Sequence, residues 1–263
     1  MLITRALIGI LGVPLAIIVI YTGGAALLIS LMLLSLLGLH EFYRMTRSHK
    51  PIRLAGYIGA IFILLGAYTG QLEGALRGAV LLFGVTFLFH AIRGLKAEMV
   101  EEMAVTFFGS FYVSVGFAHL LLLRNPAYGI SLAIVVLLAT WTSDTVAYAV
   151  GHFYGHHQIS PVISPKKTIE GTVAGFMGTI LVVLVAGKSL GWMTSGQFFV
   201  LGVVLAVAAP LGDLFESYIK RASQVKDAGT IIPGHGGILD RFDSLLFASV
   251  AAYYIVTAMV GAG

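Results

Sequence analysis

The sequence predicts an all-α, polytopic membrane protein, and three observations support this fold class. The 263-residue chain is 58% hydrophobic and only 11% charged, whereas a soluble domain typically has about 25% charged residues. Its mean hydropathy is +0.96. Its apolar residues gather in runs close to the roughly 20 residues that a helix needs to cross a bilayer. This composition excludes a soluble globular domain.

Nine apolar runs can be placed along the chain, and we expect each of them to form a membrane-spanning helix. We expect the active site of the protein to face the cytoplasm. The first stretch is too long for one helix, so we place a tight turn at Thr22–Gly24 and expect Pro14 to kink the first span. A cleaved signal peptide is the competing interpretation, but the stretch exceeds the usual apolar core. The predicted spans are 6–21, 24–39, 54–70, 76–92, 104–123, 129–150, 172–190, 195–212 and 244–260.

The positions of the basic residues predict the orientation of these spans. Thirteen of the sixteen Lys and Arg residues lie at the N-terminus or in loops after even-numbered spans. Basic loops stay in the cytoplasm, so we expect a cytoplasmic N-terminus and an external C-terminus. Membrane topology thereby explains the pI near 9.3, and we expect no nucleic-acid partner. Cysteine is absent, which excludes disulfides and thiolate metal sites.

The segment 213–243 holds four of the five aspartates of the chain. Asp213, Ser217 and Lys220 are spaced to share one helix face, and Asp240 and Asp243 are three residues apart at the start of the last span. Carboxylates from two helices can clamp Mg²⁺, which prefers oxygen ligands. The glycines around His235 would let backbone amides approach a phosphate. Taken alone, however, a glycine cluster is more often a simple turn, and such a histidine is as often a capping or packing group.

Asp144 is the fifth aspartate and lies inside the sixth predicted span. An ionised group there is costly, so it should face a polar cavity or a polar partner. Thr140 and Tyr148 would extend the same helix face into a polar stripe. A hydrogen bond that holds two helices together is the alternative role.

The loop after this span contains Ser164-Pro165-Lys166-Lys167-Thr168. We expect Ser164-Pro165 to open a helix and to leave both lysines beside free amide hydrogens that attract anions. Two lysines before a span are also common as simple topology determinants. Their proximity to Thr168, and the acidic segment predicted at the same membrane face, favour a binding role.

Several strings of this sequence resemble one enzyme family in detail. The order Ser-x2-Lys-Arg-x4-Lys-Asp-x-Gly-x3-Pro-Gly-His-Gly-Gly-x2-Asp-Arg-x-Asp, from Ser217 to Asp243, is similar to the hallmark of phosphatidate cytidylyltransferases, also called CDP-diacylglycerol synthases. The 164–171 loop, Asp144 with Tyr148, and the 41–44 string Glu-Phe-Tyr-Arg also resemble that family. The similarity therefore covers nearly the whole chain.

The resemblance implies that CTP and phosphatidic acid react to give CDP-diacylglycerol and pyrophosphate. It also implies a Mg²⁺ cofactor, with a second cation left open, and a homodimer among membrane lipids in the cell inner membrane of a bacterium. We expect a single catalytic domain over 1–263, with Asp213 and Asp240 as metal ligands. The other candidate catalytic residues are Lys226, Asp227 and Asp243. The candidate substrate-binding residues are Asp144, Lys166, Lys167, Thr168, Ser217, Lys220, Arg221, His235, Gly236, Gly237 and Arg241.

Two other functions stay open at the level of sequence. A CTP-dependent lipid or polyprenol kinase could use the same groups but would transfer the γ-phosphoryl group. An ion-coupled transporter could use Asp144 as an ion site, although most of the aspartates lie at one interface rather than at the midplane. A P-loop ATPase is disfavoured because Gly187-Lys188-Ser189 lacks the preceding glycine of that motif.

Overall fold

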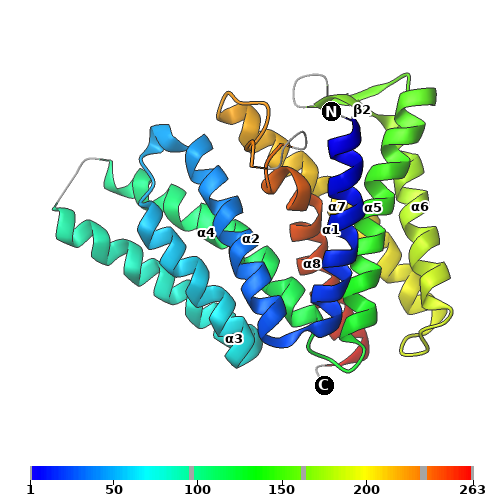
Figure 1. The fold of residues 1–263 in the computed structure, drawn as a ribbon, viewed down its shortest axis with the longest axis horizontal. Helices are drawn as coiled ribbons and strands as arrows, with labels where there is room; N and C mark the ends of the chain where they lie inside the picture. The colour runs from blue at the N-terminus through cyan, green and yellow to red at the C-terminus, as the bar shows by residue number, and fades with distance from the viewer. Residues whose placement is uncertain (1, 95–97, 161–163, 232–235, 262–263) are drawn as a thin grey trace. The chain divides into compact units, whose positions relative to one another are not determined.

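The computed structural model describes residues 2–94, 98–160, 164–231 and 236–261, and these residues are almost entirely helical (Figure 1). The predicted all-α class is confirmed. Seven of the helices found in this part of the chain, α2 to α8, are long and apolar enough to cross a membrane. The helices are α1 (Leu2–Thr22), α2 (Gly24–Met45), α3 (Arg53–Arg93), α4 (Met99–Leu123), α5 (Gly129–Tyr154), α6 (Ile169–Gly187), α7 (Ser195–Ala222) and α8 (Leu239–Val260), with a short 3₁₀ turn, η1 (Arg47–His49).

The chain forms two compact units that interleave along the sequence. The first unit contains Met1–Leu122 and Ser223–Arg241, and the second contains Leu123–Ala222 and Phe242–Gly263. The segment between α7 and α8 therefore belongs to the first unit, although both helices lie mainly in the second. That one catalytic domain extends over 1–263 stays a prediction.

The first unit begins with the helix pair α1 and α2. Gly23 separates them with φ 60° and ψ −152°, a backbone conformation that favours glycine. This confirms the turn predicted at Thr22–Gly24. Pro14 lies inside α1, and the kink expected there stays a prediction.

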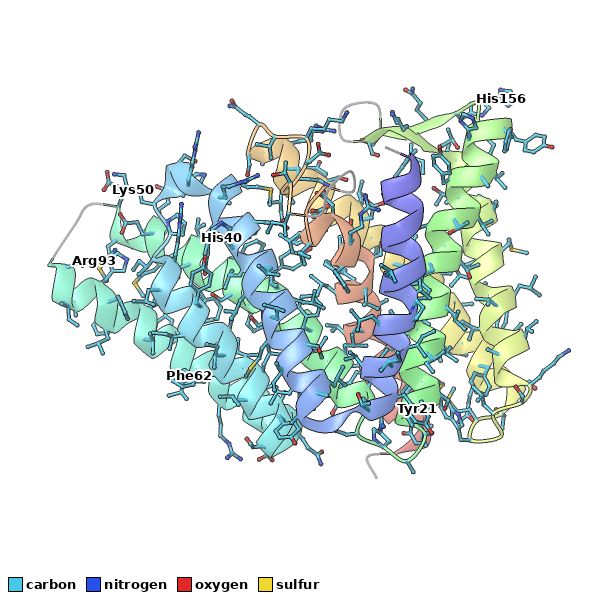
Figure 2. The ribbon with its side chains drawn as sticks, in the orientation of Figure 1. Tyr21, His40, Lys50, Phe62, Arg93 and His156 are labelled. Atoms are coloured by element: carbon cyan, nitrogen blue, oxygen red, sulfur yellow. The ribbon has the colours of Figure 1, made fainter. Side chains whose placement is uncertain are left out.

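α3 covers two of the predicted spans, 54–70 and 76–92. Its helical geometry is interrupted at Gly70 and Gln71, so the break comes at the start of the predicted loop. The two halves then fold back on each other: a Cβ added to Gly74 would collide with the carbonyl oxygen of Gly66. Figure 2 labels Phe62 in the first half and Arg93 at the end of the second. By length and composition, α3 is one of seven candidate membrane spans in the described part of the chain. The count of nine spans therefore stays a prediction.

α4 completes the first unit by packing against the C-terminal end of α2. The Tyr43 hydroxyl donates to the carbonyl oxygen of Thr106 at 2.7 Å and lies 2.7 Å from the Ser110 hydroxyl. Tyr43 is fully buried. Hydrogen bonds of this kind in the apolar interior fix the rotation of α2 about its axis.

The second unit is built on α5, α6 and α7, which pack against one another. Glycines on α6 allow a close approach to α5, since a Cβ on Gly175 would lie 2.8 Å from the carbonyl oxygen of Ser143. Small residues are common where membrane helices meet. α8 packs on α7 through the rings of Phe215 and Phe247, whose centroids are 5.2 Å apart.

A β-hairpin connects α5 to α6, and its presence corrects one prediction. β1 (Gln158–Ser160) pairs antiparallel with β2 (Ser164–Thr168), so Ser164-Pro165 does not open a helix. α6 begins at Ile169 instead, where the Thr168 hydroxyl accepts the N–H of Gly171 at 3.2 Å. The threonine side chain satisfies one of the free amides at the start of the helix. A proline side chain has no oxygen that could accept such an amide. Lys166 and Lys167 consequently lie on a strand.

Candidate active site

In the first unit, the segment between α7 and α8 is held by Asp240. The Oδ2 atom of Asp240 accepts the N–H of Ala228 at 3.0 Å and the N–H of Gly237 at 2.8 Å. A carboxylate that accepts two backbone N–H groups ties both ends of this segment to the first turn of α8. The structure thus gives Asp240 a clear positioning role, while its predicted role as a metal ligand stays a prediction.

Glu41 on α2 is a second carboxylate at this segment. Its side chain is buried, and its Oε2 atom accepts the N–H of Leu239 at 3.0 Å. Glu41 belongs to the 41–44 string that resembles the family, but it was not among the predicted site residues. Its place in that string, two residues after the end of the predicted span 24–39, was the signal that could have identified it.

The other candidates in this segment are mostly exposed to solvent. Lys226, Asp227 and Arg241 are exposed. Their charged side chains are therefore accessible to a ligand from water. Gly236 has φ 80°, which favours glycine at that position. His235 lies outside the described residues.

In the second unit, the hairpin brings a lysine to α7. The Lys167 ammonium lies 2.5 Å from Asp213 Oδ2, and both side chains are about 30% exposed. The Ser217 hydroxyl is 3.4 Å from Asp213 Oδ1. We expected the 164–168 loop to lie beside the start of the acidic segment, and the contact between Lys167 and Asp213 confirms this.

One turn further along α7, a second lysine is paired with a carboxylate. Lys220 Nζ lies 2.5 Å from Glu216 Oε2, with Glu216 fully buried and Lys220 nearly so. Glu216 was absent from the predicted site, although its position three residues after Asp213 places it on the same helix face. Lys220, predicted to contact phosphate, therefore has an internal counter-ion.

Asp243 joins these carboxylates from α8. Its side chain is 7% exposed, and it interacts electrostatically with Asp213, Glu216 and Asp144. Gly212 makes the approach possible, because a Cβ there would collide with the carbonyl oxygen of Asp243. The second unit thus gathers four acidic side chains and two lysines around the C-terminal part of α7.

The remaining candidates of the second unit have varied surroundings. Asp144 and Tyr148 are exposed on α5, and the Tyr148 ring stacks on His152 with centroids 5.9 Å apart. Thr168 caps α6, as described above. Lys166 and Arg221 are exposed.

The acidic groups of the second unit fit a magnesium ion by their chemistry. Within the described ranges, no group of three or more His, Asp or Glu side chains is arranged to hold a metal. Mg²⁺, however, is usually bound by one or two carboxylates together with substrate phosphates and water. Asp213 and Asp243 provide such a pair, whereas the predicted pair of Asp213 and Asp240 is divided between the two units.

Comparison with known proteins identifies the family. The model of the cytidylyltransferase family matches residues 3–259. A phosphatidate cytidylyltransferase of Staphylococcus epidermidis is 33% identical over 92% of this chain and 94% of its own length, and one of Staphylococcus saprophyticus is 32% identical with the same coverage. One of Bacillus subtilis is 30% identical over 96% of each chain. This chain belongs to the cytidylyltransferase family.

Proposed function

We propose that this protein is a phosphatidate cytidylyltransferase, which makes CDP-diacylglycerol and pyrophosphate from CTP and phosphatidic acid in phospholipid biosynthesis. The observation that carries the proposal is the family match over residues 3–259, with relatives of that name aligned over at least 92% of this chain. The membrane helices support it further, because a lipid acceptor can reach an enzyme of this kind from within the bilayer.

In this reaction a phosphatidate phosphate oxygen attacks the α-phosphorus of CTP. The new bond joins that oxygen to the α-phosphorus, and the bond to the bridging oxygen of the β-phosphate breaks, releasing pyrophosphate. The nucleophile is already an anion, so no strong general base is needed. The barrier comes from bringing two anions together and from the charge on the leaving group, so electrostatic alignment should dominate.

The paired lysines of the second unit suit this task. Lys167 and Lys220 are held at carboxylates, Asp213 and Glu216 respectively, so their ammonium groups are already ordered before a phosphate arrives. We assign them to phosphate contacts, together with the exposed Lys166. Preordered cations stabilise developing charge without reorganisation during the reaction.

We also propose Mg²⁺ as the cofactor, with Asp213 and Asp243 as the side chains that would hold it. When bound, the ion would neutralise charge on the phosphates of CTP and help to align them.

The proposed topology has the N-terminus in the cytoplasm and the C-terminus outside the inner membrane. The expected homodimer is checked by the mass of the detergent-purified protein in solution.

The decisive experiment follows radioactive phosphorus from CTP into lipid. With phosphatidic acid as acceptor, label from α-³²P CTP should enter the lipid phase together with cytidine, while label from γ-³²P CTP should stay in water as pyrophosphate. Lipid that carries γ label, with CDP left in solution, would identify a kinase instead. No transfer to any lipid, together with ion-dependent solute uptake, would identify a transporter.

A further inference from the structure

Glu41 is an acidic side chain buried within the first unit, on α2. It is 1% exposed, and its Oε2 atom accepts the N–H of Leu239 at 3.0 Å. Its Oε1 atom is buried and has no hydrogen-bond partner among the described residues. Burying a carboxylate oxygen without a hydrogen-bond partner costs folding free energy. A functional role for Glu41 would explain why this cost is tolerated.

Two glycines of the segment between α7 and α8 lie directly against this carboxylate. A Cβ on Gly237 would lie 2.5 Å from Glu41 Oε2, and a Cβ on Gly229 would collide with Glu41 Oε1. Gly229 and Gly237 have no positive φ, so it is lack of space that excludes a side chain at both positions. The Glu41 carboxylate therefore lies between the two ends of the segment.

Asp240 extends the same arrangement. Its Oδ2 atom accepts the N–H groups of Ala228 and Gly237, and it directly follows Leu239, which donates to Glu41. Two carboxylates thus hold residues 228–229 and 236–239 in one conformation. Lys226 and Asp227, both exposed, immediately precede the part that is held.

α2 is a rigid support for this arrangement. Leu239 packs on α2 one turn before Glu41, since a Cβ on Gly38 would lie 3.2 Å from its side chain. Two residues after Glu41, Tyr43 is hydrogen-bonded to α4. Figure 2 labels His40, the residue before Glu41, at this end of α2. The position of the Glu41 carboxylate is therefore fixed by the core of the first unit.

We propose that Glu41 is a positioning residue that holds residues 226–229 and 236–240 in the conformation that binds CTP. The inference rests on the proposed function and adds to it a residue that acts without touching the substrate. The segment offers the exposed Lys226 to phosphate groups, and such a cation binds well only when it is held in place beforehand. Glu41 acts through hydrogen bonding and volume.

Three variants and one control test this role. Glu41→Ala removes the acceptor and the volume, and Glu41→Gln keeps both without the charge. Gly229→Ala places a methyl group where the Glu41 carboxylate lies. Ser35→Ala is the control, because it removes another buried polar contact of α2, the 3.1 Å bond to Ser114, six residues before Glu41. For each variant, kcat and the KM for each substrate are normalised to folded protein.

We expect Glu41→Ala to raise the KM for CTP at least about tenfold and to lower kcat, because a displacement of about 1 Å in a positioned group can reduce rates about 100-fold. The KM for phosphatidic acid should change much less. Glu41→Gln should stay within about threefold of the wild type. Gly229→Ala should impair the wild type but add nothing in the Glu41→Ala background, where the obstructing carboxylate is gone. The Ser35→Ala control should keep both KM values.

Hydrogen exchange gives a readout that does not depend on activity. The amides of Ala228 and Leu239 should exchange faster in Glu41→Ala than in Ser35→Ala. Unchanged exchange, or unchanged kinetics per folded molecule, would overturn the positioning role. A Glu41→Gln variant as impaired as Glu41→Ala would also overturn it, in favour of a role for the charge. If the wild type makes no CDP-diacylglycerol while the exchange result holds, the proposed function fails and the positioning of the segment stands.

Discussion

Asp213→Asn tests the centre of the acidic cluster in the second unit. The change replaces one carboxylate oxygen by an amide nitrogen of nearly the same size, so no cavity is created. It removes the charge that pairs with Lys167 at 2.5 Å. It also weakens a bond to Ser217 that is already long, at 3.4 Å.

The structure predicts a small effect on stability and a large effect on turnover. Lys167 and Asp213 are 28% and 30% exposed, and ion pairs with this much solvent contact contribute about 0.2–1 kcal/mol. The free energy of unfolding should therefore fall by less than about 1 kcal/mol. Loss of a ligand to a catalytic cation removes several kcal/mol of transition-state stabilisation, and each 1.36 kcal/mol changes a rate about tenfold. We therefore expect kcat/KM to fall by more than about 100-fold.

The assay compares Asp213→Asn with Lys167→Met in detergent, using thermal unfolding and initial rates over a series of Mg²⁺ concentrations. Both variants break the same ion pair, so their unfolding midpoints should shift by similar amounts. Only Asp213→Asn should raise the Mg²⁺ requirement, whereas Lys167→Met should act mainly on the KM for CTP. Near-normal turnover of well-folded Asp213→Asn at the wild-type Mg²⁺ concentration would refute the assignment.

Three further predictions concern the first unit and the membrane topology. Asp240→Ala should abolish turnover, because it releases the N–H groups of Ala228 and Gly237. Asp240→Asn can still accept these two N–H groups. If it is equally inactive while the hydrogen exchange of these amides stays normal, Asp240 is a metal ligand rather than a residue that positions the loop. Gly74→Ala should destabilise the protein by about 1–3 kcal/mol through overpacking, whereas Gly84→Ala, with nothing within 4 Å, should not; equal unfolding midpoints would contradict the close packing of the α3 halves. A reporter fused after Gly263 should be external and one near Lys50 cytoplasmic, and finding both on one side would disprove the nine-span count.

The order and type of the helices could be predicted from the sequence because they depend on properties that are local in the chain. The length of an apolar run decides whether a helix can cross a bilayer, and the turn at Thr22–Gly24 was predicted because the first apolar stretch is too long for one helix. The hairpin at Gln158–Thr168 could not be predicted in this way. Proline after Ser164 suggested a helix start, but strand pairing and the Thr168 cap place it at Ile169.

The chemical character of the site was also determined by sequence, since it depends on residue types and their order between Ser217 and Asp243. The partners of those residues were decided only by the tertiary structure. Glu41 reaches Leu239 across 198 residues of chain, and Lys167 reaches Asp213 only because the hairpin and α7 meet in the second unit. Helical spacing relates residues a turn or two apart, whereas contacts between distant segments depend on how whole helices pack. For this reason the local pattern showed which groups are present, and only the packed fold showed which lysine pairs with which carboxylate and which glutamate holds the glycine-containing segment.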